Sequence, residues 1–168
     1  MNIITKFTVA TEQGMNVLLM LTRELAMEKF SSLIEQKIID NYISEKFNDQ
    51  TLINELNSMS NQWLVTYVDD NPAGYARITS KGRRPSTLDG KRAIRIADFG
   101  ILKKYTDPAV SNSLLEKCLN VCKPYESIWI NEYVQNPVIK LFANKGFIKQ
   151  KESWQLDELA LTSACLIA

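Results

Sequence analysis

The fold is decided by Ser127-Ile-Trp-Ile-Asn-Glu-Tyr133 and by the segment after it, Gln135-Asn-Pro-Val-Ile-Lys-Leu-Phe-Ala-Asn-Lys-Gly-Phe147. The first segment predicts a strand and the second predicts a short helix. Gly146 is expected to end that helix, because only glycine enters the left-handed C-cap conformation without a steric clash of its side chain. Phe147 would then begin another strand and pack back onto the helix. A strand, a helix and a strand joined in this way form an αβ corner, which many folds share.

Length and composition set the outer limits of the interpretation. A chain of 168 residues suits one domain with a sizeable core, so residues 1–168 are interpreted as a single domain. The net charge of +1 argues against a bulk field that would attract nucleic acid or an anionic membrane. The sequence contains no histidine, which removes the commonest general base and metal ligand, so no metal site is expected.

The cysteines and the first residues of the chain bear on its compartment. Cys118 and Cys122 are four residues apart in a helical pattern and therefore share a face, where we interpret them as small apolar core residues. Met1–Phe7 lacks a basic region followed by a long apolar run, and no run reaches transmembrane length. We therefore expect a cytoplasmic protein with reduced thiols.

Outward from the corner, apolar periodicity and turn residues predict the other elements. These are a strand Ile3–Ala10, a helix from the Thr11 cap to about Ala26, a helix Leu33–Phe47, a third helix capped by Asn48, a hairpin of Trp63–Val68 and Ala73–Thr79 around a turn at 69–72, a loop Lys81–Arg92, a strand Ala93–Leu102 and a helix Pro108–Cys122. With the C-terminal elements, the order is β-α-α-α-β-β-β-α-β-α-β-β. This order predicts an α/β (α+β) domain whose mixed, mostly antiparallel central sheet is flanked by helices.

The element order and the closing segment together resemble the GNAT (Gcn5-related) N-acetyltransferases, in which an Asn opens a helix that ends in F-Y-E-K-x-G-F. The middle of the chain is similar to one branch, the bacterial spermidine/spermine N-acetyltransferases of the PaiA type, on Asn41–Phe47, Leu52, Glu55-Leu56, Met59-Ser60, Gln62, Ala73-Gly-Tyr75 and Ile128-Trp-Ile130. The resemblance extends over residues 12–168. It implies a GNAT fold and the transfer of an acetyl group from acetyl-CoA to a small amine.

The resemblance also implies a site for acetyl-CoA in a V-shaped gap between strands 93–102 and 127–133. In the family, a Q/R-x-x-G-x-G/A loop opens the following helix, and its N–H groups and helix dipole hold the pyrophosphate. The residues expected at the cofactor are Phe99, Gly100 and Ile101 for the pantetheine arm, Thr106, Asp107, Pro108, Ala109, Val110, Ser111 and Asn112 for the pyrophosphate, and Asn136, Lys140 and Phe142 on the far side. The closing segment is one residue short of the family pattern, so either Gln135 or Asn136 matches the family Asn.

The phosphate loop departs from the family pattern in several ways. Thr106 stands where Gln or Arg is usual, and Ala109 and Ser111 stand where glycines are usual. Pro108 has no N–H to offer a phosphate, and Ala109 would cost about 1–2 kcal/mol if the loop needed a positive φ there. Asp107 places a carboxylate in the anion site. An Asp N-cap followed by Pro also forms a helix start that needs no ligand.

Amine acetylation needs a base for the ammonium and an acid for the leaving thiolate. The family often uses the Tyr of F-Y as the acid, but the matching residue here is Phe142, so Tyr133 is our candidate acid. For the base, the family branch commonly has Glu at the position of Ala97, and Asp98 is expected to point to the opposite face by strand alternation. Glu132 is our candidate base, and a water relayed by backbone carbonyls is the alternative.

The acceptor is least defined by the sequence. The loop before the fourth strand carries a cluster of five basic residues, Lys81, Arg83, Arg84, Lys91 and Arg92. Such a cluster would repel a polycation and could suit an anionic acceptor or acyl group. The alternative is a solvated surface loop with no binding role. We expect a small-molecule amine as acceptor and neither nucleic acid nor a membrane as partner, and a homodimer is compatible with the sequence. The altered loop and the missing acid leave a second interpretation open, a GNAT-fold protein that has lost catalysis and binds a ligand or partner.

Overall fold

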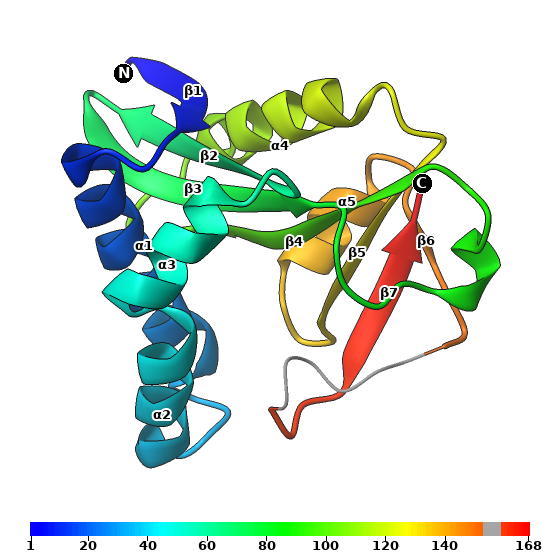
Figure 1. Cartoon of the computed structure of the whole chain (residues 1–168), viewed down its shortest axis with the longest axis horizontal. Helices are drawn as coiled ribbons and strands as arrows, with labels where there is room; N and C mark the ends of the chain where they lie inside the picture. Colours follow the sequence, from blue (N-terminus) through cyan, green and yellow to red (C-terminus); the bar gives the residue numbers. More distant parts are fainter. Residues whose placement is uncertain (153–158) are drawn as a thin grey trace.

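The computed structural model describes residues 1–152 and 159–168, and the elements within them follow the predicted order (Figure 1). They are β1 (Ile3–Thr8), α1 (Glu12–Phe30), α2 (Gln36–Lys46), α3 (Asp49–Asn57), β2 (Asn61–Val68), β3 (Asn71–Thr79), β4 (Ala93–Ile101), α4 (Pro108–Cys122), β5 (Ser127–Tyr133), α5 (Val138–Ala143), β6 (Ile148–Lys149) and β7 (Ser163–Ile167). A short 3-10 helix, Ser86–Leu88, lies within the polar loop before β4.

The strands form one sheet in the order β1-β2-β3-β4-β5-β7-β6. The strand pairs are antiparallel apart from β4 and β5, which run parallel. In that pair Ala93–Arg95 lies beside Ser127–Trp129, and the register ends there although both strands continue. These observations confirm the predicted α/β fold with a mostly antiparallel sheet, and they leave an open gap between the two parallel strands.

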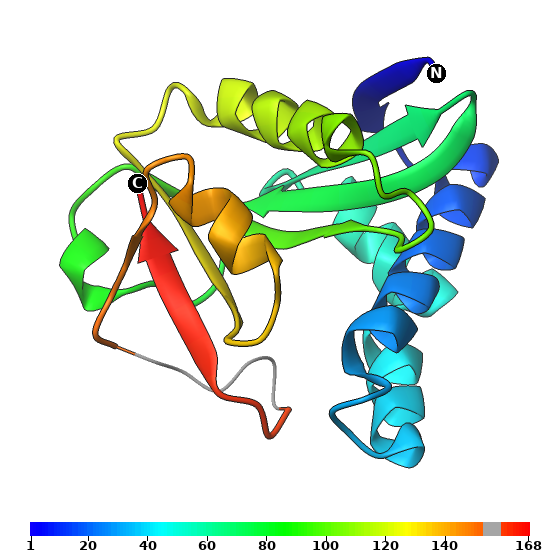
Figure 2. The same cartoon turned by 180° about the vertical axis from the view of Figure 1, so that it is seen from behind.

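Helices cover both faces of the sheet. The α1–α3 group lies against one face, where Leu18, Leu21 and Leu25 of α1 pack with Trp63 and Tyr75 of the hairpin (Figure 1). The other face is covered by α4 and α5, as the view from behind shows (Figure 2). The apolar side chains of α4 there include Cys118 and Cys122, both fully buried, so their interpretation as core residues is confirmed.

Most helix starts agree with their predicted caps. The side chains of Thr11, Asn48 and Asp107 each accept a hydrogen bond from a backbone N–H in the first turn of their helix. The hairpin turn is tighter than predicted, because Asp69 and Asp70 adopt φ of 47° and 66° and close a two-residue loop.

The end of α1 differs from the prediction in a way that matters for the site. The helix continues past Ala26 to Phe30, whose ring is buried and lies 5.7 Å from the rings of Tyr42 and Tyr133. Burial of this aromatic side chain favours the extra turn over fraying. The same turn carries Lys29 over the gap between β4 and β5. Among the described helices, none is both long enough and apolar enough to cross a bilayer.

Candidate active site

A cavity of about 450 Å³ lies where β4 and β5 diverge. Its walls come from the last turns of α1, from the end of β4 and from the segment that joins β5 to α5. Because the β4–β5 register ends at Arg95, the edge of Phe99–Ile101 that would pair with β5 lies along the cavity instead. An extended ligand can therefore pair with this strand edge as another strand would.

Five residues predicted to hold acetyl-CoA line this cavity, namely Phe99, Gly100, Ile101, Ser111 and Asn136. Asn136 is 6% exposed, and its Oδ1 accepts a hydrogen bond from the backbone N–H of Val138 at 3.0 Å. Its Nδ2 has no hydrogen-bond partner within the described part of the chain. Buried amide donors are rarely left unpaired, so this group is available to an acceptor atom of a ligand.

The start of α4 is closed by its own residues. The Asp107 carboxylate accepts the N–H of Ala109 at 2.9 Å, and Pro108 has no N–H to offer. Ala109 lies within the helix and has no positive φ, so the strain considered for this position does not arise. Of the residues predicted to face the pyrophosphate, six do not line the cavity, namely Thr106, Asp107, Pro108, Ala109, Val110 and Asn112.

Phe142 is expected beside the cofactor, but it does not line the cavity. The side chain is fully buried under α4, and its ring lies 5.3 Å from the ring of Phe99 and 5.0 Å from that of Phe147. The aromatic residue belongs to the core because α5 turns its most apolar face to the sheet. Leu141 faces the cavity in its place, and Lys140 is exposed outside it.

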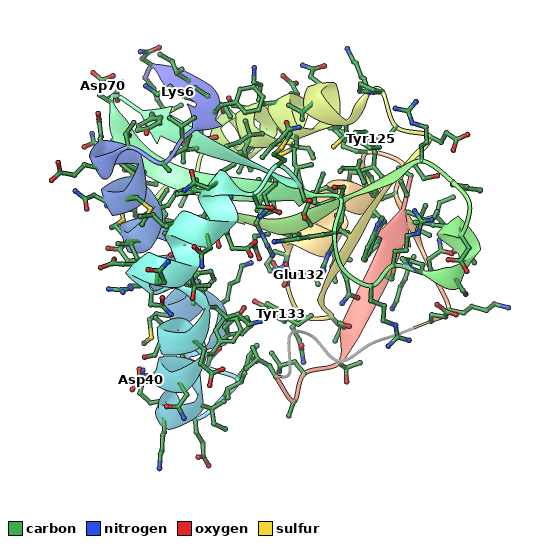
Figure 3. The ribbon with its side chains drawn as sticks, viewed as in Figure 1. Lys6, Asp40, Asp70, Tyr125, Glu132 and Tyr133 are labelled. Carbon is green, nitrogen blue, oxygen red and sulfur yellow. The ribbon has the colours of Figure 1, made fainter. Side chains whose placement is uncertain are left out.

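A lysine and a glutamate meet at the inner end of the cavity. Lys29 Nζ lies 3.6 Å from Glu132 Oε2, and Glu132 is 7% exposed. Burial lowers the pKa of Lys29, but the carboxylates of Glu132 and Asp98 outweigh it and hold the pKa above its usual range. Lys29 is therefore an ammonium at neutral pH, held where the two carboxylates converge. Glu132 and Tyr133 project from the end of β5 toward the α1–α2 side of the sheet (Figure 3).

Asp98 lies on this same side, so the expectation that it points away from the face of Ala97 is wrong. The β3–β4 register pairs Arg77 with Asp98 but Ile78 with Ile96, which leaves Ala97 as the extra residue of a β-bulge. A bulge interrupts the strict alternation of side chains. Ala97 and Asp98 consequently line the same small cavity.

The Asp98 carboxylate belongs to a chain of alternating charges. Arg77 Nε lies 3.0 Å from Asp98 Oδ2, and Arg77 Nη1 lies 3.2 Å from Glu55 Oε2, which is itself paired with Lys81. Burial raises the pKa of Asp98, but Arg77, Lys29 and Arg95 outweigh it and hold the pKa below its usual range. Asp98 is thus ionised at neutral pH. It can attract a cationic group of a ligand as well as the cations of the chain that surround it.

Tyr133 lies where β5 leaves the sheet and lines the main cavity. Its hydroxyl donates to the backbone carbonyl of Lys29 at 3.4 Å, and its ring packs against Phe30. Burial raises the pKa of Tyr133, and Glu132 adds to this while Lys29 opposes it. The phenol therefore keeps its proton at neutral pH and is able to donate it.

Two smaller cavities continue from the carboxylates to the surface. One of about 20 Å³, large enough for a water molecule, is bordered by Lys29, Asp98 and Glu132. The other, of about 180 Å³, is bordered by Asp98 and Arg77 and shares Tyr42 and Phe47 with the first. Because they share lining residues, we take the two together as a narrow route to the Lys29–Glu132 pair.

The basic loop does not take part in these cavities. None of its five basic residues borders the 450 Å³ or the 20 Å³ cavity among the residues described. Lys81 pairs with Glu55 at 2.9 Å, and Arg84 donates to the backbone carbonyl of Lys91 at 3.0 Å. Within residues 1–152 and 159–168, no group of three or more His, Cys, Asp and Glu side chains is arranged to hold a metal ion.

Sequence reasoning missed Lys29 and Arg77 as site residues. Lys29 lies one residue before the end of a helix whose predicted end was Ala26, and Arg77 lies in a strand whose alternation places it beside Trp63. The pattern that could have indicated Arg77 is a cation in a strand of otherwise buried residues, which requires a carboxylate partner.

Several solved structures with this architecture are acetyltransferases. PaiA N-acetyltransferase from Thermoplasma acidophilum, in complex with coenzyme A, has a TM-score of 0.75 at 15% identity over 98% of this chain and 98% of its own. A GCN5-related N-acetyltransferase from Rhodopseudomonas palustris has a TM-score of 0.70 at 10% identity over 99% and 95%. Arabidopsis thaliana Naa50, in complex with the bisubstrate analogue CoA-Ac-MVNAL, has a TM-score of 0.62 at 14% identity over 98% and 97%.

No protein-family model matches the sequence. The structural likeness extends over nearly the whole chain, although no more than 15% of residues are identical in these three structures. The chain therefore has the fold of the GNAT acetyltransferases.

Proposed function

We propose that this protein is an acyl-CoA-dependent N-acetyltransferase that moves an acetyl group from acetyl-CoA to a small primary amine. The observation that carries the proposal is the junction of two cavities, one shaped for an extended ligand and the other narrow and bordered by ionised side chains. Leu25 and Lys29 border both cavities, Tyr133 borders the larger one and Glu132 borders the smaller one. GNAT-fold acetyltransferases solved with CoA or a CoA analogue support the same reaction class.

The pantetheine arm of acetyl-CoA fits the main cavity for a physical reason. The arm carries two amide groups, and the open edge of Phe99–Ile101 offers backbone donors and acceptors in strand geometry. The side-chain Nδ2 of Asn136 supplies a further donor on the opposite wall. Lys103 borders the same cavity, so its ammonium is placed to offset phosphate charge where α4 offers few free N–H groups.

The chemistry requires removal of one proton from the incoming ammonium and delivery of one to the leaving thiolate. Glu132 is the proposed base, because it is buried and ionisable at the end of the narrow route. Tyr133 is the proposed acid, because it lines the cofactor cavity and keeps its proton at neutral pH. The amine nitrogen attacks the thioester carbonyl, and the C–S bond breaks. The thiolate takes the phenolic proton, and the second proton lost by the nitrogen restores the phenol.

The narrow route argues for a small acceptor. Its innermost part has room for about one water molecule, and its outer part is bordered by Tyr42, Phe47 and Trp63. A polyamine would need carboxylates free to pair with several ammonium groups. Asp98, Glu55 and Glu132 are already paired with cations of the chain, so a single-amine acceptor is favoured over spermidine despite the resemblance to the PaiA branch.

One observation favours a second function, that of a GNAT-fold protein that binds a ligand or partner without catalysis. The Asp107 carboxylate occupies the start of α4, where the family binds pyrophosphate, and it repels phosphate. On this alternative the cavity would still hold an organic ligand, but acetyl-CoA would not bind.

Calorimetric titration with acetyl-CoA and with CoA distinguishes the two functions. Binding of both, followed by thiol release in the presence of a panel of small amines, is the result expected for an acetyltransferase. Binding without thiol release for any amine in the panel would favour the binding protein. The absence of heat from either ligand at concentrations that saturate a known acetyltransferase would show that acetyl-CoA is not its substrate.

The three cysteines are unpaired and buried, which supports a reducing compartment such as the cytoplasm for this reaction.

A further inference from the structure

We infer that Lys29 is itself an acyl acceptor, so that the protein acylates its own Lys29 side chain with acyl-CoA. The inference rests on the proposed function, because it requires acyl-CoA in the main cavity. It adds a modification site that the fold alone does not imply, and the site lies inside the chamber where the acceptor amine is expected.

The position of Lys29 carries the inference. Its side chain borders both the 450 Å³ cavity and the 20 Å³ cavity, and so spans the boundary between cofactor and acceptor. Its Cε passes over Gly100, at 3.6 Å from the place where a Cβ on that glycine would lie. Gly100 lies in the strand edge proposed to pair with the pantetheine arm, so the end of the lysine chain lies beside that arm.

The surroundings of Nζ match those that an amine acceptor needs. Glu132 Oε2 is 3.6 Å away, and Asp98 acts on the same ammonium from the neighbouring strand. Thus Lys29 occupies the place between two carboxylates that a substrate ammonium would take. No other chain is needed to bring the amine into the chamber, and the intramolecular position gives Lys29 an advantage over a free amine.

The reaction balances with acyl-CoA as the one co-reactant. The Lys29 ammonium gives a proton to the Glu132 carboxylate, and its nitrogen then forms a C–N bond with the thioester carbonyl carbon. The C–S bond breaks, and the thiolate takes the second proton lost by the nitrogen, so that an amide and CoA thiol are formed. The carboxylates hold Lys29 in its charged form, so the step depends on Glu132 as base.

Acylation would change the chamber as well as the lysine. The amide has no charge, so Glu132 would lose its counter-ion and Asp98 would keep only Arg77 and Arg95. A carboxylate without a counter-ion attracts an ammonium group. Self-acylation would therefore leave a chamber that binds a cationic amine better than the unmodified protein does.

The test is intact-mass measurement and peptide mapping of the full chain after incubation with acetyl-CoA. The expected result is the gain of one acetyl group at Lys29, with a rate that saturates in acetyl-CoA and is independent of protein concentration. The exposed Lys123 serves as an internal measure of uncatalysed acetylation, and it should remain mostly unmodified over the same time. Lys29→Arg keeps the positive charge and should gain no acetyl group at position 29.

A second variant separates catalysis from simple reactivity. Glu132→Gln keeps the shape of the side chain and should slow acetylation of Lys29 by about 10²-fold while leaving that of Lys123 unchanged. Equal rates at Lys29 in this variant and in the parent would overturn the inference. So would an unmodified Lys29 in protein that calorimetry shows to be saturated with acetyl-CoA, a result that would leave the proposed acetyltransferase function intact.

Discussion

At the scale of single residues, the proposed acid is Tyr133, because Phe142 stands where the resemblance to the acetyltransferases implies a tyrosine. Phe142 occupies the position of the family tyrosine but lies in the core, fully buried between Phe99 and Phe147. A hydroxyl added there would be buried among apolar side chains, which is costly unless it finds a hydrogen-bond partner. Tyr133 comes from a different element and brings a protonated phenol to the cavity wall. Tyr133, at the end of β5, is therefore the acid that we propose.

The first prediction is that Tyr133→Phe lowers turnover while the protein keeps its fold. Loss of one acid should reduce the rate by about 10-fold to 10²-fold, the lower part of the range for acid–base assistance, because thiolate leaves readily. The measurement is thiol release at saturating acetyl-CoA. Tyr125→Phe is the matched control, since Tyr125 lies just before the start of β5, away from Tyr133 (Figure 3), and contacts Arg92. Equal turnover in the parent, Tyr133→Phe and Tyr125→Phe would show that Tyr133 takes no part in the reaction.

The second prediction concerns pH and the Asp98 carboxylate. Its folded pKa lies below the ordinary value, so it contributes stability at pH values above its unfolded pKa of about 3.9. That contribution is lost as the pH falls through the folded pKa. Urea unfolding from about pH 5 to about pH 2 should show a steep loss of free energy in the parent. Asp98→Asn should have a lower free energy of unfolding at neutral pH, because Arg77 and Lys29 lose a partner. On acidification, that free energy should fall by less in the variant than in the parent. If the free energy of unfolding changed with pH in the same way in the parent and in Asp98→Asn, the lowered pKa of Asp98 would be contradicted.

At the scale of elements, α4 shows how closely local chemistry determines a boundary. The Asp-Pro pair predicts a helix starting at Pro108, and α4 runs from Pro108 to Cys122, as predicted. The end of α1 was predicted less well, because its last turn is stabilised by the distant Tyr133 ring and not by a local signal. The bulge at Ala97 had no sequence signal either, since no glycine marks it, and so the orientation of Asp98 was predicted wrongly.

The site follows the same division between local and distant causes. The strand segment Phe99–Ile101 and Asn136 could be placed from sequence, because they belong to elements with clear patterns. The network of Lys29, Arg77 and Asp98 could not, because its members come from α1, β3 and β4 and meet only in the folded sheet. When a charged residue pairs with a residue of another element, no periodic spacing in the sequence predicts the pair.

The third prediction tests what the start of α4 contributes. Asp107→Ser retains an oxygen that can cap Ala109 N–H but removes the negative charge. Its unfolding free energy should fall by less than the approximately 0.5–2 kcal/mol expected for Asp107→Ala. CoA should bind the serine variant more tightly than the parent, because a repulsive charge is lost. Asp40→Ser removes a charge from the outer face of α2, away from α4 (Figure 3), and should leave CoA affinity as it is. Calorimetry on the folded variants gives the comparison, and equal affinities throughout would place the pyrophosphate elsewhere.

At the scale of the whole molecule, the sheet consists of two parts joined by a short parallel contact. The part formed by β1–β4 meets the part formed by β5–β7 through Ala93–Arg95 and Ser127–Trp129, and the cavity begins where that contact ends. A ligand in the cavity touches both parts, with Phe99–Ile101 on one side and Asn136 on the other. Bound acyl-CoA thus adds a connection that the two strands themselves do not make.

The fourth prediction follows from this connection. Acetyl-CoA at about 100 times its dissociation constant should stabilise the folded chain by about 2.7 kcal/mol, since it binds the folded state alone. For a chain of this size that corresponds to a rise in Tm of about 5–10 °C. Hydrogen exchange should slow at Phe99–Ile101 and near Asn136 together, because the ligand contacts both walls. Slower exchange on one wall alone would show that the ligand binds at a single edge and does not join the two parts. With dephospho-CoA, which lacks one phosphate, the same two walls should be protected, because the contacts of the arm lie in the cavity and not at the phosphates.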